Sequence, residues 1–598
     1  MCGVAGIMAY GAEAPRPEES ELLAMREHMR ARGPDGAGLW RSLDDAVLLA
    51  HRRLAILDLS ARAAQPMSSE DGRFVIVFNG EIYNYRALRA ELEARGERFL
   101  TTSDTEILLR LFAREGIAML ARLRGMFAFA IYDATERRLH LARDPYGVKP
   151  LYYADDGRSF RFASQVKALL AGGGVDRRID NGGVAGFCLL GSVPEPFTLY
   201  EAISAVPAGC FLSVDARGVR AAQPFASIAQ RLASVAPQPR ISRREHVKAA
   251  LRESVAAHLV ADVDVGLFLS GGVDSGALLG LMRDCGVSRL RAVTLAFEEF
   301  SGLREDEAPM AARIAAHYGA QHSVRRVSQG EFEADLPALL AAMDQPSIDG
   351  VNMWFVAKAA REAGLKVALS GVGGDELLAG YPSFYEIPFW ARMTSLAHRS
   401  GVGPWIRRAG AALFPRLFTR NPKLFSLAEY GGSYEGAYLL RRGVLLPHQL
   451  ASIIGVERAE AGLERLRFYS LARALVTPDP GKPRSRVCAL ESGLYLRNQL
   501  LRDADWAGMA HSVEVRTPFV DYTLLGEIAP FIAGLNRGDG KALLAAAPGK
   551  ALPRDVLARG KTGFGVPMRA WLGTQAEQRN VSRGWAQQVL AAHVGALS

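Results

Sequence analysis

Cys2 is the residue whose position most directly suggests chemistry. The residue after Met1 is small, so we expect Met1 to be removed, leaving Cys2 with both a thiol and a free α-amine. The two groups titrate near neutrality, with reference pKa values of roughly 8.5 and roughly 7.7–8.0. The amine can take the thiol proton and later return it to a leaving group, so one residue can serve as nucleophile and base. Gly3 lets the backbone approach a substrate closely.

Five motifs follow Cys2-Gly3-Val4-Ala5-Gly6 within the first 165 residues or so. They are Arg32-Gly33-Pro34-Asp35, Ala50-His51-Arg52-Arg53-Leu54, Asn79-Gly80-Glu81-Ile82-Tyr83-Asn84, Ser103-Asp104-Thr105-Glu106 and Arg143-Asp144-Pro145-Tyr146-Gly147-Val148-Lys149-Pro150. Each alone has an ordinary interpretation, such as a turn or a helix cap. Together and in this order, the series resembles the class II glutamine amidotransferases, which are glutaminases with an N-terminal nucleophile.

That resemblance implies a role for two residues beside the nucleophile. Attack of Cys2 on the glutamine side-chain amide creates a tetrahedral oxyanion, which needs fixed hydrogen-bond donors. The Asn79 side chain and the Gly80 backbone N–H would supply them. We interpret His51 as structural rather than as a base, because the amine of Cys2 already provides one.

The same resemblance implies a pocket for free glutamine. Arg53 suits the α-carboxylate, because a guanidinium binds a carboxylate through two hydrogen bonds. Glu81 and Asp104 suit the α-ammonium. The implied glutamine-binding residues are Arg53, Leu54, Ile56, Asn79, Glu81 and Asp104.

A second group of residues forms a predicted strand, turn and helix. It reads Leu267-Phe268-Leu269-Ser270-Gly271-Gly272-Val273-Asp274-Ser275-Gly276. Small residues expose backbone N–H groups, and a helix N-terminus adds a partial positive charge, so the turn should hold a phosphate. It is not a Walker A motif, because no Gly-Lys-Ser/Thr follows. It resembles the pyrophosphate-binding loop of ATP pyrophosphatases, which cleave ATP to AMP and pyrophosphate.

Three later motifs extend this pattern. They are Val367-Ala368-Leu369-Ser370-Gly371-Val372-Gly373-Gly374-Asp375-Glu376, Val513-Glu514-Val515-Arg516-Thr517-Pro518-Phe519-Val520-Asp521 and Lys561-Thr562-Gly563-Phe564-Gly565-Val566-Pro567. The whole order resembles asparagine synthetases of the glutamine-hydrolysing type and covers most of the chain. In that family, aspartate attacks the α-phosphate of ATP to give β-aspartyl-AMP and pyrophosphate. Ammonia from the first site travels through an internal tunnel and displaces AMP.

The resemblance therefore implies ATP and Mg²⁺ as cofactors, and glutamine with aspartate or another carboxylate as substrates. Asp274 and Asp375 are hard oxygen ligands suited to Mg²⁺. Lys561 would neutralise charge developing on the phosphate. The implied ATP-binding and pyrophosphate-binding residues are Ser270, Gly271, Gly272, Asp274, Ser275, Leu295, Ser370 and Gly371.

Val372 departs from the family pattern, which has a glutamate there that is assigned to the synthetase chemistry. Valine can neither accept a proton nor bind a cation. Either Glu376, Asp375, Asp306 or Glu307 substitutes for it, or the acceptor differs. Relatives of this fold close β-lactam rings, form lactams in peptides or amidate other carboxylates, and a peptide or a sugar acid is therefore an alternative acceptor.

The segment Asp344-Gln345-Pro346-Ser347-Ile348-Asp349-Gly350-Val351-Asn352 has two interpretations. It precedes the second glycine-rich turn and could shape an acceptor pocket. It also reads as a turn before a helix spanning residues 352–363.

The pattern of apolar residues changes near residue 210. Strands are expected before it at residues 74–78, 127–132 and 139–143, the last two as a hairpin, with helices at residues 85–95 and 105–115 and an N-cap at Ser103. After residue 241, Ala/Leu-rich helices alternate with strands at residues 263–269, 293–297 and 367–370, which indicates a parallel sheet.

We predict an α/β fold with three parts. Residues 2–210 form a four-layer α/β/β/α glutaminase domain of the N-terminal-nucleophile type, and residues 211–240 form a linker. Residues 241–598 form an α/β parallel-sheet synthetase domain resembling the adenine nucleotide α-hydrolases.

Composition excludes several other classes. The hydrophobic fraction is 49% and the formal charge is +9 without a basic run, so nucleic acid is not an expected partner. No stretch of about 18 apolar residues occurs, so no membrane partner is expected. Five cysteines without C-x-x-C spacing argue against disulfides and zinc and favour a reduced cytoplasm. A homodimer is the assembly considered.

Overall fold

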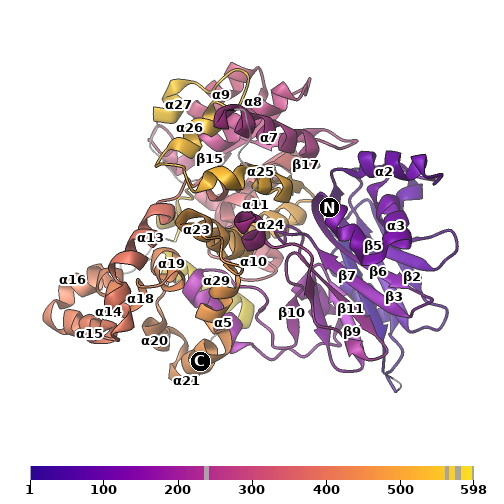
Figure 1. Cartoon of the computed structure of the whole chain (residues 1–598), viewed down its shortest axis with the longest axis horizontal. Helices are drawn as coiled ribbons and strands as arrows, with labels where there is room; N and C mark the ends of the chain where they lie inside the picture. The colour runs from indigo at the N-terminus through magenta and orange to yellow at the C-terminus, as the bar shows by residue number, and fades with distance from the viewer. Residues whose placement is uncertain (1, 12, 235–241, 559–564, 573–580, 596–598) are drawn as a thin grey trace.

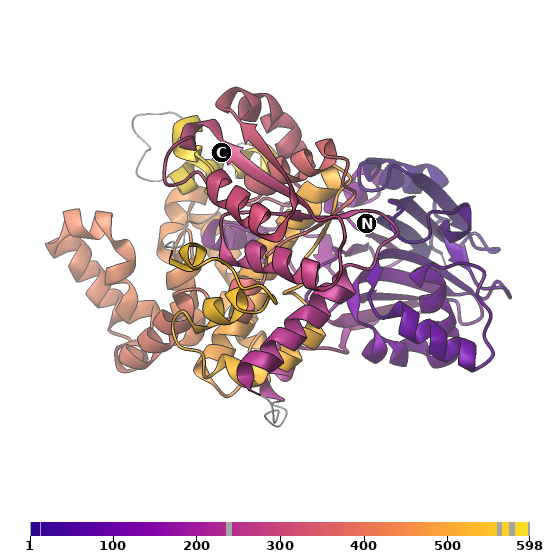
Figure 2. The ribbon, with the colours of Figure 1, turned by 90° about the horizontal axis from the view of Figure 1, so that it is seen from above.

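Two domains lie against each other in the computed structural model, which describes residues 2–11, 13–234, 242–558, 565–572 and 581–595. Figure 1 shows the strand-rich N-terminal domain in indigo and purple, and the helix-rich C-terminal domain in pink, orange and yellow. Figure 2, seen from above, keeps the two domains in contact along one side.

Two antiparallel sheets form the centre of the N-terminal domain. One has the order β10-β8-β9-β1-β3-β2, from β1 (Gly3–Ala9), β2 (Gly36–Arg41), β3 (Val47–Arg53), β8 (Tyr152–Asp155), β9 (Ser159–Ala163) and β10 (Ile203–Ala205). The other has the order β12-β11-β7-β6-β5-β4, with β13 paired to β11, from β4 (Met67–Ser68), β5 (Phe74–Ile82), β6 (Gly125–Asp133), β7 (Arg138–Arg143), β11 (Cys210–Asp215), β12 (Gly218–Val219) and β13 (Gln223–Pro224).

The alternation of side chains along β5 assigns its two faces. Val75 and Val77 pack with residues of the other sheet, whereas Ile76 and Phe78 pack with the outer helices. Because side chains alternate with a period of two, Asn79 and Glu81 continue the face of β5 that looks toward the other sheet. The strand that builds the core therefore also aims two polar residues at the space between the sheets.

Helices cover both outer faces of the two sheets. Leu108 of α3 joins the cluster on the outer face of β5, and Leu22 of α1 joins the cluster on the outer face of β1. The predicted α/β/β/α layering and the N-cap at Ser103 are confirmed, since Ser103 Oγ accepts the Thr105 N–H. The helices of this domain are α1 (Glu19–His28), α2 (Tyr85–Ala94), α3 (Asp104–Glu115), α4 (Val166–Gly172) and α5 (Asn181–Leu190).

The stretch expected to be connecting chain after residue 210 contains regular structure. Strand β11 continues to Asp215 and pairs with β7, with Leu212 and Val214 buried in the core between the sheets. Helix α6 (Ile228–Ala233) follows. The alternation of apolar residues in β11 is short and is followed by an Arg-Gly turn, so the sequence alone does not identify it as a strand.

The C-terminal domain is built on a parallel sheet, as predicted. Its order is β16-β15-β14-β17-β18, from β14 (Val265–Phe268), β15 (Arg291–Phe297), β16 (Gln321–Val327), β17 (Val367–Leu369) and β18 (Glu514–Arg516). Strands β15 and β16 are added on one side of β14, and strands β17 and β18 are added on its other side. In open α/β sheets, ligands bind where the order reverses, at the carboxyl ends of the strands. That point lies between β14 and β17.

Helices surround this sheet and extend from it. Those near the sheet are α7 (Arg243–His258), α8 (Val273–Asp284), α9 (Ala308–Tyr318), α10 (Gln329–Ala342), α11 (Val351–Glu362), α12 (Gly374–Leu377), α24 (Arg502–Ala510), α25 (Tyr522–Ile532) and α26 (Asp539–Ala545). Others are α19 (Tyr434–Arg442), α20 (Ala451–Ile454), α21 (Val456–Leu466), α22 (Phe468–Ala474), α23 (Pro483–Glu491), α27 (Arg554–Ala558), α28 (Met568–Trp571), α29 (Val581–Val594) and the π-helical segment η5 (Ser492–Leu501).

A group of helices projects away from both domains at the left of Figure 1. We call residues 383–430 the lateral lobe. It comprises α13 (Ser383–Met393), α14 (Ser395–Arg399), α15 (Gly403–Leu413), α16 (Pro415–Arg420), α17 (Pro422–Phe425) and α18 (Leu427–Tyr430). Across the described part of the chain, none of the helices combines the length and the apolar character needed to cross a bilayer.

Buried charges join the two domains. Arg32 donates to both carboxylate oxygens of Asp505 on α24, at 2.7 and 3.1 Å, and the two side chains are 2% and 5% exposed. Asp344 accepts the backbone N–H groups of Val166 and Lys167 from the other side of the interface. Such pairs hold the two domains at a fixed separation.

Asp505→Asn should lower the free energy of unfolding by about 3–5 kcal/mol, because it leaves the buried Arg32 cation without its counter-charge. Chemical denaturation followed by tryptophan fluorescence measures the loss. Glu93→Gln, which breaks the exposed Arg89–Glu93 pair, is the matched control and should change stability by less than about 0.5 kcal/mol. Equal effects of the two substitutions would contradict a role for the buried pair.

Candidate active sites

Cys2 and Asn79 meet between the two sheets of the N-terminal domain. The backbone N–H of Cys2 donates to Asn79 Oδ1 at 2.9 Å. Asn79 is fully buried, and among the described residues its Nδ2 group has no hydrogen-bond partner. An unpaired buried donor is costly unless a ligand satisfies it. Its place beside Cys2 suits an oxyanion that forms on a substrate carbonyl.

Cys2 is held from its other side by the interface. Arg32 Nε donates to the Cys2 carbonyl oxygen at 3.1 Å while its outer nitrogens bind Asp505. Burial raises the pKa of the Cys2 thiol above its ordinary value. The thiol therefore stays protonated at neutral pH until a base removes its proton, as expected for a nucleophile with its own amine.

Gly80 lies on β5 beside Asn79, and His51 lies on β3. A Cβ on Gly80 would lie 2.1 Å from the Met126 carbonyl oxygen, so only glycine allows β5 to lie this close to β6. His51 is buried, its Nε2 lies 3.1 Å from the Phe78 carbonyl oxygen, and burial lowers its pKa to about 3. A neutral ring bonded to a strand carbonyl fits the structural interpretation of His51.

The Arg53 guanidinium lies over the chain that follows β3. It donates to the carbonyl oxygen of Ser60 at 2.8 Å and to that of Asp58. These bonds fix its orientation at the edge of the nucleophile site. Leu54 and Ile56 are buried immediately after it.

Glu81 and Asp104 are two buried carboxylates at the same end of the site. Asp104 accepts the Ile82 N–H at 2.9 Å, and burial raises its pKa to about 6. Burial also raises the pKa of Glu81 well above its ordinary value. Two carboxyl groups in an environment of this kind are suited to an ammonium ligand, whose charge would stabilise their ionised forms.

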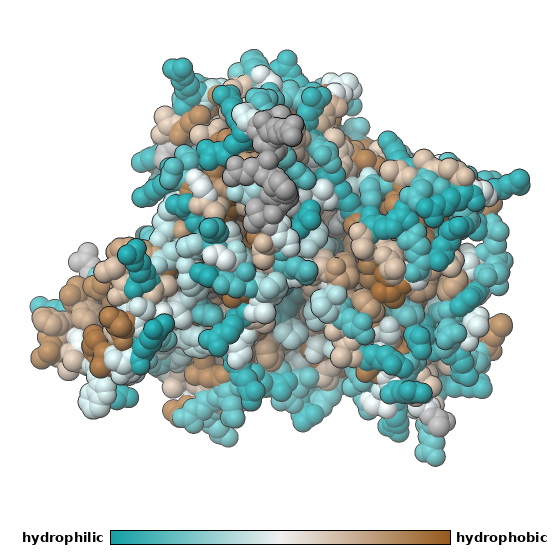
Figure 3. Space-filling view, in the orientation of Figure 1, coloured by the Kyte–Doolittle hydropathy of each residue, from teal (hydrophilic) through white to brown (hydrophobic). Residues whose placement is uncertain are grey.

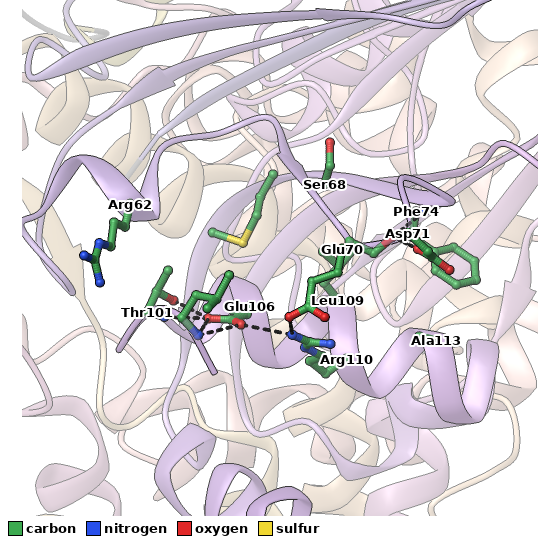
Figure 4. A pocket seen from close by; sticks show the side chains of 13 residues that line it. Arg62, Ser68, Glu70, Asp71, Phe74, Thr101, Glu106, Leu109, Arg110 and Ala113 are labelled. Atoms are coloured by element: carbon green, nitrogen blue, oxygen red, sulfur yellow. Dashed lines mark hydrogen bonds and ion pairs between the residues drawn. The ribbon is translucent and has the colours of Figure 1, made fainter. Parts of the chain in front are cut away.

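The loop ahead of Asp104 is ordered from outside the site. A surface hollow of about 760 Å³ lies beside this loop. In it, Glu106 faces Thr101 and Arg110 (Figure 4). The Glu106 carboxylate accepts the backbone N–H groups of Leu100 and Thr101. None of the residues predicted to bind glutamine lines this hollow, so we assign it a supporting role.

Sequence reasoning missed two residues that reach this site from the other domain. Arg516 on β18 is fully buried, 2.5 Å from Glu514 and 3.4 Å from Glu81. Burial opposes ionisation of Glu514, but nearby cations, including Arg516, outweigh it and hold its pKa below the ordinary value. The motif around Arg516 was visible in the sequence, but its proximity to Glu81 depends on tertiary packing.

The predicted phosphate turn joins β14 to α8. Ser275 Oγ accepts the Ser270 N–H at 3.0 Å and lies 2.9 Å from Ser270 Oγ, which in turn accepts the Gly272 N–H. These bonds close the turn at the N-terminus of a 12-residue helix. The backbone N–H groups and the helix dipole make it suitable for an anionic phosphate.

A cavity of about 410 Å³ opens at the carboxyl ends of β14 and β17. It brings together six of the eight predicted ATP-binding residues, namely Ser270, Asp274, Ser275, Leu295, Ser370 and Gly371. Gly271 and Gly272 belong to the turn but do not line this cavity. Lys561 lies outside the described residues.

Lys541 is a cation of this site that sequence reasoning missed. Its Nζ lies 2.6 Å from both oxygens of Asp274 and 2.5 Å from Asp375. Burial opposes its charge, but the two carboxylates outweigh burial and raise its pKa. No motif marks a lone lysine in an alanine-rich helix, so only the fold reveals it. The two carboxylates converge on one cation and fit the donor set expected of a magnesium site beside phosphate.

Val372 lies in the cavity wall together with Glu376. Burial raises the pKa of Glu376 to about 8. Tyr381 Oη donates to Glu376 Oε1 at 3.0 Å, and in the described chain Oε2 has no partner. Asp306, by contrast, pairs with Arg326, and Glu307 accepts the Gly271 N–H. Of the four candidates for the missing carboxylate, Glu376 has the environment of a general base.

The sequence allows the segment at residues 344–352 to be interpreted either as part of an acceptor pocket or as a turn before a helix, and the structure shows features of both. Asp344 and Gln345 bond to backbone groups of the N-terminal domain, Gln345 to the Leu199 N–H. Asp349 and Asn352 line the cavity, and the helix predicted at 352–363 is confirmed as α11.

Asp503 faces the same end of the cavity as Asp349. It accepts Ser347 Oγ and Trp506 Nε1, both at 2.8 Å, and burial with the nearby Asp349 raises its pKa to about 8. This end of the cavity is therefore acidic, with Tyr495 of the π-helical segment as a further wall.

Asn79→Ala should reduce glutamine hydrolysis by about 10²–10³-fold in kcat, because it removes the buried Nδ2 donor beside Cys2. Release of glutamate and ammonia from glutamine measures the effect. Gln65→Ala is a control that removes a buried amide hydrogen-bonded to the Phe78 N–H, outside the nucleophile site. A similar loss in both variants would mean that β5 has been displaced rather than an oxyanion donor lost.

Comparison with known proteins identifies a domain family for each half of the chain. A family model for a glutamine amidotransferase domain matches residues 1–226, and a model for asparagine synthase matches residues 246–593. A putative glutamine-hydrolysing asparagine synthetase of Mycobacterium tuberculosis is 35% identical, covering 96% of this chain and 88% of that protein. Asparagine synthetase 1 of Bacillus subtilis is 31% identical over 99% and 90%, and asparagine synthetase B of Escherichia coli is 30% identical over 65% and 66%.

The asparagine synthase model alone matches more than half of the chain, and two of these relatives align along nearly all of it. The resemblance stated from the motifs is thereby confirmed. This chain belongs to the asparagine synthase family, as a member with the glutamine amidotransferase domain and the synthase domain on one polypeptide.

Proposed function

We propose that this chain transfers the amide nitrogen of glutamine to L-aspartate, with the stoichiometry ATP + L-aspartate + L-glutamine + H₂O → AMP + diphosphate + L-asparagine + L-glutamate. The observation that carries the proposal is the position of Arg516. Its guanidinium lies beside Glu81 in the nucleophile site, and its carbonyl oxygen accepts the Ser370 N–H in the nucleotide cavity. One residue thus contacts both sites, which supports transfer of ammonia between them.

The first half of the reaction takes place at Cys2. The thiol adds to the glutamine side-chain carbonyl while the α-amine accepts its proton, and Asn79 Nδ2 donates to the oxyanion. Collapse of this intermediate breaks the C–N bond, and the amine returns the proton to the leaving ammonia. Water then hydrolyses the thioester to glutamate. Arg53 would orient the α-carboxylate, and Glu81 with Asp104 the α-ammonium.

The second half begins with ATP in the 410 Å³ cavity. Ser270 and Ser275 place the phosphate turn against the pyrophosphate, and Lys541 offsets its charge. Asp274 and Asp375 would hold Mg²⁺, which supplies Lewis-acid stabilisation of the phosphate oxygens. The acceptor carboxylate attacks the α-phosphorus, pyrophosphate leaves, and an acyl-adenylate remains.

Ammonia completes the reaction by attacking the acyl carbon and displacing AMP. The attacking nitrogen must lose a proton, and Glu376 is the carboxylate placed to accept it. Asp349 and Asp503 suit the α-ammonium of aspartate, which is carried by Cα, one methylene group away from the β-carboxylate that is activated. This acidic end favours an acceptor that bears a cation.

A second candidate acceptor is a different carboxylate, such as that of a peptide, a lactam precursor or a sugar acid. Val372 favours it, because the cavity wall has an apolar side chain where the family pattern has glutamate. The same adenylation and ammonia chemistry would apply. Function is decided by the site rather than by the fold.

A screen of AMP release against aspartate and alternative carboxylates separates these acceptors. Aspartate should stimulate pyrophosphate–ATP exchange and AMP release above every other carboxylate tested. Cys2→Ala should abolish the use of glutamine while keeping the use of ammonium chloride, because the nucleophile belongs to the first site alone. Exchange that is indifferent to aspartate would reject aspartate as the acceptor, and loss of both nitrogen sources in Cys2→Ala would reject the division into two sites.

Glu376→Gln should lower glutamine-dependent amide formation by about 10²–10⁴-fold and remove its rise with pH. In the wild type the rate should increase through pH 8, because the pKa of Glu376 is raised to about 8 and only the ionised carboxylate accepts a proton. Val372→Glu added to Glu376→Gln should restore part of the activity. A pH profile of the single variant that keeps the wild-type shape would exclude Glu376 as the base.

Thermal unfolding provides the control for this substitution. The pKa of Glu376 is 4.5 in the unfolded chain and about 8 in the folded one. Between these two pH values, the folded protein holds a proton that the unfolded chain has lost. The free energy of unfolding therefore falls progressively as the pH rises through this range. A glutamine side chain does not titrate, so it does not destabilise the fold in this way as the pH rises. Glu376→Gln should therefore melt no lower than the wild type at pH 9.

A further inference from the structure

The lateral lobe has an unusual charge pattern. Between residues 387 and 428 the sequence contains seven lysine and arginine residues and no aspartate or glutamate. The rest of the chain has nearly balanced charges, so this excess is local. Arg392, Arg399, Arg408 and Arg416 are exposed at its surface.

The same lobe exposes large apolar side chains. In the described residues, seventeen large hydrophobic side chains are exposed, and ten of them lie in the lobe. Leu396 is 79% exposed, and Trp405 and Leu413 are each 72% exposed. The others are Phe389, Met393, Val402, Ile406, Phe414, Leu417 and Leu424. Figure 3 shows the brown surface gathering over α14, α15 and α16 at the left of the molecule.

Helix α15 buries small residues and exposes large apolar ones, which is the opposite of a typical helix in a soluble protein. A Cβ on Gly403 would lie 2.4 Å from Glu429 Cα, and one on Gly410 would lie 2.2 Å from the Phe425 ring. The glycine face therefore packs tightly against α17 and α18. Trp405 and Ile406 are left on the solvent side, where a soluble helix normally carries polar residues.

Polar bonds hold the lobe in this arrangement. Arg407 Nε donates to Glu429 at 2.5 Å, and His398 Nδ1 lies 2.7 Å from the Glu429 carbonyl oxygen. Lys423 Nζ donates to the Gly443 carbonyl oxygen at 2.7 Å. The apolar surface is thus displayed by a packed structure rather than by a loose segment.

We propose that the lateral lobe docks the enzyme on the surface of an anionic lipid bilayer. Tryptophan, phenylalanine and leucine on one side of short helices, with arginines beside them, are the residues that enter the interface between headgroups and acyl chains. The absence of acidic residues from 387 to 428 matches a negatively charged surface. The lobe lies on the bilayer and does not cross it, so this inference needs no helix that spans the membrane.

A second copy of the chain is a poorer occupant of this surface. A two-fold contact would bring the same basic lobe against itself and place arginines of both copies in one interface. Like charges facing each other oppose association. Anionic headgroups instead supply the opposite charge together with an apolar layer.

Sedimentation of the full-length protein with lipid vesicles tests the proposal. The wild type should sediment with vesicles of phosphatidylcholine mixed with phosphatidylglycerol and remain in solution with phosphatidylcholine alone. The triple substitution Leu396→Ser, Trp405→Ser, Leu413→Ser should abolish this binding. Arg408→Gln with Arg416→Gln should weaken it by about fivefold for each arginine lost, and added salt should weaken it further.

Leu43→Ser with Leu100→Ser is the matched control, because these leucines are 108% and 64% exposed in the other domain. This control should bind vesicles as the wild type does, and all variants should retain glutamine hydrolysis at the wild-type rate. Wild-type protein that stays in solution with anionic vesicles would overturn the proposal. So would a wild-type dimer, measured by light scattering, that the triple substitution converts to a monomer without any vesicle binding.

Discussion

The ion pairs and the backbone hydrogen bond by which the fully buried Arg516 joins the two candidate sites are the interactions on which the rest of this structure depends. Arg516 enters the glutaminase domain from the edge strand of the synthetase sheet and lies between Glu514 and Glu81. A buried cation requires nearby anions, and those anions require it in return. The edge strand β18, the strand β5 with its Glu81, and the turn after β17 therefore have to keep a fixed relation to each other.

A second buried arginine, Arg32, also joins the two domains. Arg32 connects the carbonyl oxygen of Cys2 to Asp505 on α24, close in sequence to β18. Two separate segments of the glutaminase domain, the turn with Arg32 and strand β5 with Glu81, thus contact one short stretch of the synthetase domain. The surroundings of Cys2 are therefore completed by residues of the neighbouring domain.

Much of this fold could be predicted from the sequence, for identifiable reasons. The alternation in Phe74–Phe78 and the parallel-sheet strands were readable because their apolar residues follow the strand period without interruption. The phosphate turn and Asn79 were readable because their chemistry requires particular residue types at fixed spacing. Lys541 was not, because a single lysine acquires meaning only when the fold places it between Asp274 and Asp375. The exposed face of α15 was not, because periodicity marks an apolar face without showing whether it points inward.

Glu81 has a further consequence for the resting enzyme. Three buried carboxyl groups, Glu81, Asp104 and Glu514, share the charge of Arg516, and burial raises the pKa values of Glu81 and Asp104. Burial therefore favours the protonated forms of Glu81 and Asp104. A ligand ammonium beside them would favour the ionised forms instead. Binding of such a ligand would release protons, so its affinity would depend on the acidity of the surrounding solution.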